Sequence, residues 1–388
     1  MGWGIVMKKI ICLFTILLLM FTASIGNSTK AFAEADPQRV IVKFKEGAQT
    51  GIAAANVAAS DENGEAETAA FEVPEGESME NYMEELEERD DVEFVEPDYQ
   101  IELAYKRKDP ELATRQYHHT QIQTAAAWKQ TKGSKKVVVA VIDDGMDVAH
   151  PELKKQFVAP YDALNKKKGT VTAGKHGTHV AGLIAASAGN GMWGAGVAPS
   201  TKIMPIDVID QNGYGYTSTL IHGIEHAIKA NVDIINMSLG SYYYSEALDQ
   251  VIQKAHKRGI VIVAAAGNEG TRNAHYPSSL NNVISVGAVT RTDVSALFSN
   301  KGPTIDLTAP GVDVYSTLPS NQFGPLSGTS MATPIVSGVA ALIKANQPSL
   351  SNKEIEKRLF SSSDDLGKAG RDDVYGHGRV NANKALKK

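Results

Sequence analysis

Cysteine is almost absent from this 388-residue chain. The single one, Cys12, lies in an apolar run near the N-terminus. If that run is removed after synthesis, the rest of the chain has no thiol, which excludes disulfides, thiol nucleophiles and cysteine-ligated metals. A chain without cysteine suits export into an uncontrolled redox environment.

A long hydrophobic run is also missing. The apolar stretch 10–21 has about a dozen residues, short of the ~20 that a membrane-spanning helix needs. Lys8 and Lys9 precede it, and the small-residue stretch 31–33 follows. Residues 1–33 are therefore predicted to be a secretory signal peptide cleaved after Ala33, with a permanent membrane anchor as the less favoured alternative. We expect a secreted, extracellular protein with no membrane attachment after cleavage.

Positive charge is scarce in one part of the chain only. Residues 34–105 contain 21 acidic and 4 basic side chains, a net charge of −17, whereas residues 106–388 contain 23 acidic and 32 basic ones, a net charge of +9. Opposite net charges favour docking of one part on the other. The alternative is that the acidic residues only form a solvent-exposed surface, which would give the same net charge. Residues 106–110 are basic and poorly patterned, as in an exposed linker. The chain is thus divided into residues 1–33, 34–105 and 106–388.

The acidic part predicts a small α+β domain. Residues 39–44 and 92–95 resemble strands, and residues 79–89 resemble an amphipathic helix. Residues 50–70 are rich in Ala, Glu and Gly and specify little.

The larger part predicts an α/β fold, mainly a parallel sheet with helices on both faces. Short, β-branched and almost wholly apolar runs alternate with helical patterns, which is typical of strands covered on both faces. The predicted strands are residues 137–142, 203–208, 232–236, 260–265 and 283–286, and the predicted helices are residues 217–230, 246–258 and 331–345.

Three motifs on this scaffold carry reactive side chains. Asp143 directly follows the predicted strand 137–142. The carboxyl ends of parallel strands are where sites form, although an aspartate at the end of a strand often only caps a turn. His176 stands in His-Gly-Thr-His-Val-Ala-Gly (176–182), at a glycine-broken start of a helix. Ser330 stands in Gly-Thr-Ser-Met-Ala (328–332) just before a helix, where a serine alone could be an N-cap. Together they match a nucleophile, a general base and the carboxylate that orients it, in the order Asp, His, Ser.

The motifs resemble those of secreted subtilisin-like serine proteases, the subtilase family, in their Bacillus-type form with an inhibitor-type propeptide. The resemblance covers nearly the whole chain. Besides the three motifs, it rests on residues 117–122, 150–151, 196–199, 236–240, 265–268, 309–311 and 375–382.

The resemblance implies further roles. Asn268 matches the asparagine that donates, with the Ser330 backbone N–H, to the oxyanion of the transition state. Two segments match those that pair with an extended peptide substrate: Ser238, Leu239 and Gly240, and the region of Gly213 and Gly215. Protein or peptide substrates are implied, and no nucleic acid, no organic cofactor and a monomer are expected.

Residues 34–105 match the family's propeptide, most clearly at 92–99. The resemblance implies an intramolecular chaperone that then blocks the cleft with its C-terminal tail. Cleavage after Tyr105 is predicted, with Lys106-Arg107-Lys108 as a trypsin-like alternative.

The chain departs from the family pattern at two places. Asp144 stands where Ser or Thr is usual; if it is buried beside Asp143, repulsion raises one pKa, and if it faces solvent it has no such effect. Structural Ca²⁺ is expected from the resemblance, but Glu152 replaces the usual Asp, Ala113 stands where a ligand Gln is expected, and the loop 187–195 is altered. No calcium ligand is therefore assigned.

The predicted function is a secreted, broad-specificity serine endopeptidase made as a self-processing zymogen. Two alternatives stay open: a narrow processing peptidase for one exported substrate, and a pseudoprotease that binds peptides on an intact fold. The sequence does not specify which side chain is preferred before the cleaved bond.

Overall fold

The computed structural model describes residues 39–45, 68–98, 109–210 and 212–387. They fall into two compact units, one within residues 1–105 and one within 106–388. The predicted signal peptide, the propeptide tail 99–105 and the linker residues 106–108 lie outside the described residues. Among the described residues, no helix is long and apolar enough to cross a membrane.

The first unit is a small α+β domain, as predicted. Its antiparallel sheet has the order β2-β1-β3, built from β1 (Arg39–Phe44), β2 (Thr68–Glu72) and β3 (Val92–Pro97), with the helix α2 (Met79–Glu87) beside β3. In β1 alternate residues Val40, Val42 and Phe44 are buried, which is the pattern of a strand with one face on a core. Ser78 caps α2 by accepting the Asn81 N–H.

The second unit contains an eight-stranded sheet with the order β11-β10-β9-β8-β4-β7-β5-β6. All neighbouring pairs are parallel except β5 with β6. The strands are β4 (Val138–Asp143), β5 (Tyr161–Asp162), β6 (Lys167–Lys168), β7 (Lys202–Asp207), β8 (Ile234–Met237), β9 (Val261–Ala265), β10 (Ile284–Val289) and β11 (Leu307–Pro310). The prediction of a mainly parallel sheet is confirmed.

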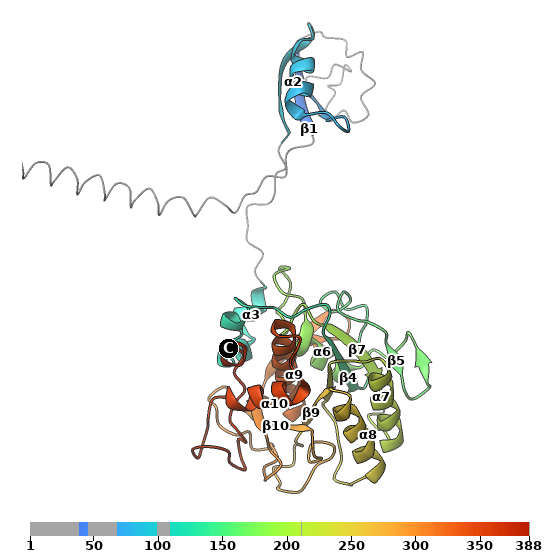
Figure 1. Ribbon diagram of the computed structural model, residues 1–388, viewed down its shortest axis with the longest axis vertical. Coiled ribbons are helices and arrows are strands. Elements are labelled where there is room, and N and C mark those ends of the chain that lie inside the picture. The colour runs from blue at the N-terminus through green and yellow to red at the C-terminus, as the bar shows by residue number, and fades with distance from the viewer. Residues whose placement is uncertain (1–38, 46–67, 99–108, 211, 388) are drawn as a thin grey trace, which may run out of the picture. The chain divides into compact units, whose positions relative to one another are not determined.

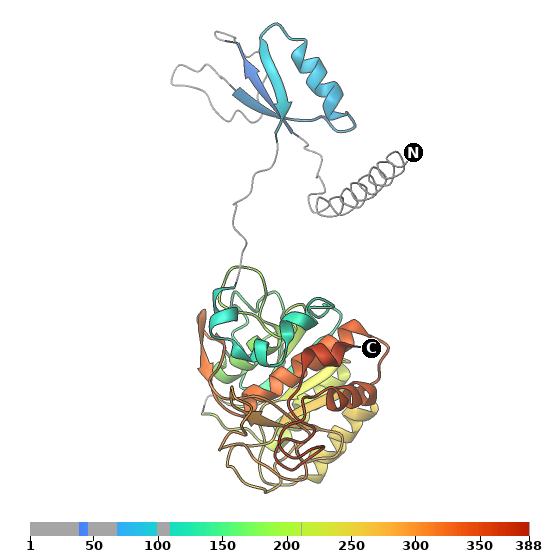
Figure 2. The same ribbon diagram turned by 90° about the vertical axis from the view of Figure 1, so that its left-hand side faces the viewer.

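Helices cover both faces of this sheet (Figures 1 and 2). Along β4, Val139 and Val141 belong to a core with residues of α6 and α9, whereas Ala140 and Ile142 belong to a core with residues of α7 and α8. This alternation explains why the strands read as continuous apolar runs, because each side chain is buried against one layer or the other. The covering helices are α6 (Lys175–Ala185), α7 (Thr217–Lys229), α8 (Glu246–Lys257) and α9 (Thr329–Asn346).

Smaller elements complete the unit. Three short helices precede β4, a hairpin precedes α9, and two helices follow it. They are α3 (Pro110–Thr114), α4 (Tyr117–Gln121), α5 (Thr124–Ala127), β12 (Val314–Leu318), β13 (Gln322–Leu326), α10 (Asn352–Ser361) and α11 (Ala382–Leu386).

Candidate active site

The site forms at the carboxyl ends of the parallel strands. Asp143 is the last residue of β4, Ser238 follows β8, and Asn268 follows the end of β9. His176 and Ser330 lie in the first turns of α6 and α9, the two helices that pack on the same face of the sheet. This is the edge at which ligands bind in open parallel sheets.

Asp143 and His176 are in direct contact. The Asp143 Oδ1 lies 2.7 Å from the His176 Nδ1 and also accepts the Asp144 backbone N–H at 2.9 Å. The Asp143 side chain is 3% exposed and the His176 side chain 36% exposed. Because an ionised carboxylate only accepts, Nδ1 of His176 carries a proton, and Nε2 is the basic nitrogen whenever the ring is neutral.

The surroundings of His176 raise its pKa. Burial lowers that pKa, but attraction to Asp143, the hydrogen bond between the two and the charge of Asp144 together outweigh burial. The imidazolium is therefore stabilised, which is the role of the carboxylate in a proton-transferring Asp-His pair.

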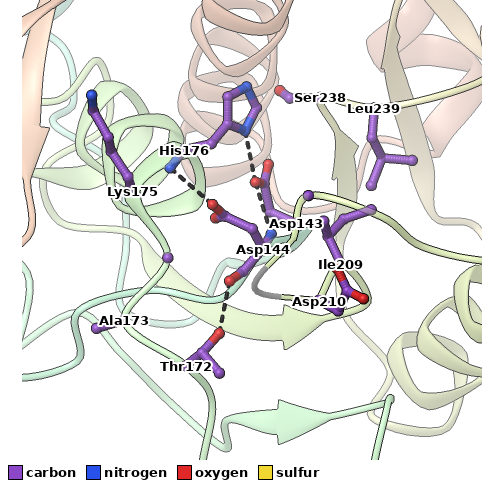
Figure 3. Close-up of a pocket in the computed structure, with 12 residues that line it drawn as sticks. Asp143, Asp144, Thr172, Ala173, Lys175, His176, Ile209, Asp210, Ser238 and Leu239 are labelled. Atoms are coloured by element: carbon purple, nitrogen blue, oxygen red, sulfur yellow. Dashed lines mark hydrogen bonds and ion pairs between the residues drawn. The ribbon is translucent and has the colours of Figure 1, made fainter.

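The Asp144 side chain is partly buried and points toward the start of α6. Its Oδ2 accepts the His176 backbone N–H at 3.1 Å (Figure 3), and its Oδ1 accepts the Gly177 backbone N–H at 2.7 Å. Burial and repulsion from Asp143 raise the pKa of Asp144 to about 6, against the opposing effect of these two bonds. The raised pKa that was expected for a buried Asp144 is found, although the side chain is only partly buried and also lines the cleft.

Ser330 and Ser238 are joined by two hydrogen bonds. The Ser330 hydroxyl donates to the Ser238 carbonyl at 3.1 Å, and the Ser238 hydroxyl donates to the Ser330 carbonyl at 2.9 Å. Among the described contacts the Ser330 hydroxyl is thus directed at Ser238 and not at His176. Loose nucleophile geometry of this kind is common in ligand-free sites.

Asn268 holds the start of α9. Its Oδ1 accepts the Thr329 backbone N–H at 2.8 Å and the Thr329 hydroxyl at 2.9 Å. A Cβ atom added to Gly328 would lie 3.6 Å from both the Asn268 Nδ2 and the Ser330 backbone nitrogen. The two nitrogens therefore border the same small space beside Gly328.

Two adjoining clefts lie beside these residues. One, of about 630 Å³, is lined by Asp143, Asp144 and His176 together with Gly213, Ser238 and Leu239 (Figure 3). The other, of about 260 Å³, is lined by the loop 213–217 and by Leu239, Gly240 and Ser241. All five residues predicted to bind substrate line one or both clefts.

Two residues that support this edge were not anticipated. The Thr172 hydroxyl lies 2.8 Å from the Asp144 carbonyl oxygen and 2.6 Å from the Asp207 Oδ2. Asp207 is fully buried at the end of β7, where it pairs in register with Asp143. An aspartate inside the apolar run 203–208 was the available signal, because a buried charge needs a partner.

The loop predicted to differ at the calcium position is closed by hydrogen bonds. The Asp109 carboxylate accepts the backbone N–H groups of Gly189, Asn190 and Gly191 at 2.7 to 3.1 Å, and both Glu152 carboxylate oxygens accept the Asn190 side-chain amide. Burial, with a further contribution from Asp109, raises the pKa of Glu152 to about 7. Within the described residues no three His, Cys, Asp or Glu side chains are grouped to hold a metal. These carboxylates are occupied by donors and do not fit a calcium ligand set.

Comparison with known proteins assigns the chain to a family. Residues 134–378 match the model of the subtilase family, and residues 26–98 match that of the fervidolysin N-terminal prodomain. Subtilisin E of Bacillus subtilis (strain 168) is 37% identical over 97% of this chain and 99% of its own length. Subtilisin of Bacillus pumilus is 42% identical over 69% of this chain and 98% of its own length.

A solved structure agrees with this assignment. The crystal structure of a lanthipeptide protease matches with a TM-score of 0.65 and 28% identity, over 71% of this chain and 95% of that one. The family match covers more than half of the chain, and the relatives align over most of their length. The chain therefore belongs to the subtilase family, as a subtilisin-like serine peptidase with an N-terminal prodomain.

Proposed function

We propose that the chain is a secreted, broad-specificity endopeptidase in which Asp143, His176 and Ser330 form the catalytic triad. The observation that carries the proposal is the 2.7 Å contact of Asp143 with His176, beside a cleft that Ser238 and Leu239 also line. The contact keeps the proton of the neutral imidazole on Nδ1, so that Nε2 can accept a proton, and it stabilises the imidazolium that then forms, as a general base requires.

The chemistry follows from these positions. The Ser330 hydroxyl turns from the Ser238 carbonyl toward the His176 Nε2, gives up its proton and attacks the substrate carbonyl. The Asn268 Nδ2 and the Ser330 N–H donate to the developing oxyanion, and His176 returns the proton to the leaving amine. Water then releases the acyl group by the same steps.

Substrate binding is proposed along the two clefts. The segments of Gly213 and Gly215 and of Ser238, Leu239 and Gly240 would pair with an extended peptide through main-chain hydrogen bonds. Hydrogen bonds to the main chain of the substrate depend little on its side chains, which supports broad specificity.

The prodomain supports synthesis as a zymogen. We propose that residues 34–105 assist folding of the parallel sheet, inhibit the enzyme and are removed by self-cleavage, and that residues 1–33 direct secretion. The opposite net charges, −17 and +9, favour association of the two parts. Structural calcium stays a proposal from the resemblance alone, and it is not proposed for the loop at Asp109 and Glu152.

The test compares the wild-type precursor with Ser330→Ala by mass spectrometry after incubation with casein. The wild type is expected to lose its prodomain near residue 105 and to cut casein at many sites, whereas Ser330→Ala stays full-length and leaves casein intact. A Ser330→Ala protein that matures with no other protease present contradicts the assignment.

A narrow processing peptidase is the second candidate, favoured by the likeness to a lanthipeptide protease. The same casein digest separates the two. Cleavage at many unrelated sequences supports broad specificity, and intact casein together with active-site labelling supports the narrow enzyme.

A further inference from the structure

The start of α6 lacks a cap of its own. The first N–H groups of a helix have no acceptor inside it, and a side chain at the N-cap position normally supplies one. Here the N-cap is Gly174, which makes no side-chain cap bond. The acceptor comes from a distant segment instead, because the Asp144 carboxylate takes the N–H groups of both His176 and Gly177.

The fit between this turn and the helix is close. A Cβ atom on Gly174 would lie 2.2 Å from the Asp144 Oδ1, and one on Gly177 would lie 2.1 Å from the Gly145 carbonyl oxygen. Both glycines are thus required by the position of residues 144–145. The contact is a built part of the site and not a chance approach of a surface carboxylate.

Asp144 is in turn held from its other side. Thr172 bonds the Asp144 carbonyl oxygen, and the Thr172 N–H and hydroxyl both lie within hydrogen-bond distance of the Asp207 Oδ2, at 3.2 and 2.6 Å. A continuous set of bonds therefore runs from the end of β7 through Thr172 and Asp144 to the first turn of α6.

We propose that Asp144 is a positioning residue for the peptidase reaction: by capping α6 across the turn after β4, it fixes His176 between Asp143 and the nucleophile. The proposal rests on the proposed triad. Two consecutive carboxylates would then hold one histidine, Asp143 by its ring and Asp144 by its backbone. A displacement of about 1 Å at such a group can cost up to ~100-fold in rate.

Asp144 also acts through its charge. The charged groups around it are Asp143 on the same turn, His176 and Lys175 on α6, Asp207 at the end of β7 and Asp210 in the loop after it. The negative charge of Asp144 adds to the increase in the pKa of His176, with Asp143 contributing more. Removing it lowers that pKa, and a purely structural cap would have no such effect.

The experiment uses Asp144→Ala and Asp144→Asn, with Asp147→Asn as the matched control. Asp147 lies on the same loop and its carboxylate also accepts two backbone N–H groups, but from Ala149 and Ser320 and not from α6. The kcat and KM for a chromogenic peptide are measured from pH 5 to 10, with active enzyme counted by fluorophosphonate titration.

Asp144→Ala is expected to lower kcat by about tenfold with KM within about twofold, because positioning acts on the transition state. Asp144→Asn keeps one acceptor oxygen and is expected to recover most of kcat. In both variants the acidic limb of kcat/KM moves to lower pH, and Asp147→Asn changes neither quantity.

An Asp144→Ala enzyme with wild-type kcat and an unmoved acidic limb overturns the proposal, as does an equal effect of Asp147→Asn. If fluorophosphonate titration finds no active Asp144→Ala enzyme, the pH profile of Asp144→Asn replaces it. An acidic limb of kcat/KM at the wild-type pH in Asp144→Asn then contradicts the proposal. Failure of the triad itself is read separately, as residual activity of Ser330→Ala.

Discussion

The first turns of α6 and α9 carry His176 and Ser330, the two side chains proposed to react, and the two turns are built in the same way. Each helix has glycine at its N-cap, Gly174 or Gly328, and neither glycine caps its helix with a side chain. In each case a residue just beyond the end of a strand supplies the acceptor, Asp144 after β4 and Asn268 after β9. Capping by a separate segment fixes the helix to the edge of the sheet, which an N-cap on the helix itself cannot do.

The difference between the two caps is their chemistry. Asn268 is neutral and has a second polar atom, Nδ2, which is proposed to donate to the oxyanion, whereas Asp144 is ionisable with its pKa raised to about 6. We therefore expect the hydrogen bonds that cap α6 to depend on pH, and those that cap α9 not to depend on it.

Removing either reactive side chain should abolish activity. Ser330→Ala and His176→Ala are each expected to lower kcat on the order of 10⁶-fold, the size known for the corresponding losses in subtilisin. The double variant should be no worse than either single one, since the groups act as a unit. The kcat values are measured on a peptide substrate. If the loss in the double variant equals the product of the two single losses, His176 and Ser330 do not act as one unit.

Asn268 should separate capping from oxyanion binding. Asn268→Ala is expected to lower kcat by roughly 10² to 10³ with little change in KM. Asn268→Asp keeps the oxygen that caps Thr329 but replaces the donor with a carboxylate, so kcat should fall at least as far. If Asn268→Asp keeps wild-type kcat, Asn268 is only a cap.

The pH profile should reflect the Asp143-His176 pair. The base must be neutral, and its raised pKa means that more of it is protonated at pH 7 than of an ordinary histidine. The midpoint of the acidic limb of kcat/KM is therefore expected above 6.5, with a fall of about tenfold per pH unit below it. A midpoint at or below 6.5 would contradict the stabilised imidazolium.

Asp109 resembles Asp144 in that its carboxylate accepts backbone N–H groups, but it lies outside the proposed active site. Asp109→Ala leaves three N–H groups of the loop 189–191 without their acceptor and should cost about 1 to 3 kcal/mol of unfolding free energy. Urea unfolding in a Ser330→Ala background avoids self-digestion. EDTA should leave the size of this Asp109→Ala effect unchanged, because the carboxylate binds backbone N–H groups directly; an effect that disappears in EDTA would show that Asp109 acts through a bound calcium ion.

An ordinary cap gives the smallest effect. In α10, Ser351 caps its own helix in a capping box with Glu354. Ser351→Ala should lower stability by about 0.5 to 2 kcal/mol and leave kcat unchanged, because α10 presents no reactive group. A drop in kcat as large as that of Asp144→Ala would mean that the site responds to any helix cap.

The sequence predicts the central fold well because buried parallel strands have a strong signature. The predicted strand 260–265 and helix 217–230 differ from β9 and α7 by one residue at an end. The strand β2 was not predicted, because Thr68–Glu72 partly overlaps a segment without clear alternation. β11 has four residues and ends in Pro310, too short to give a pattern.

The site is less predictable than the fold for a similar reason. Motifs suffice to place Asp143 and His176 together. The orientation of Asp144 is set by N–H groups 32 and 33 residues further along the chain, which local pattern does not encode. The hydrogen bond of Ser330 to Ser238, 92 residues apart, could not be predicted either.

Labelling with a fluorophosphonate probes the proposed nucleophile itself, because such reagents react with a serine only when a base and an oxyanion site activate it. The mature enzyme is labelled and digested, and the modified residue is identified by mass spectrometry. We predict one adduct per molecule, on Ser330, which is absent in His176→Ala. A protein that is folded yet unlabelled, or labelled on another residue, would contradict the assignment of Ser330 as the nucleophile.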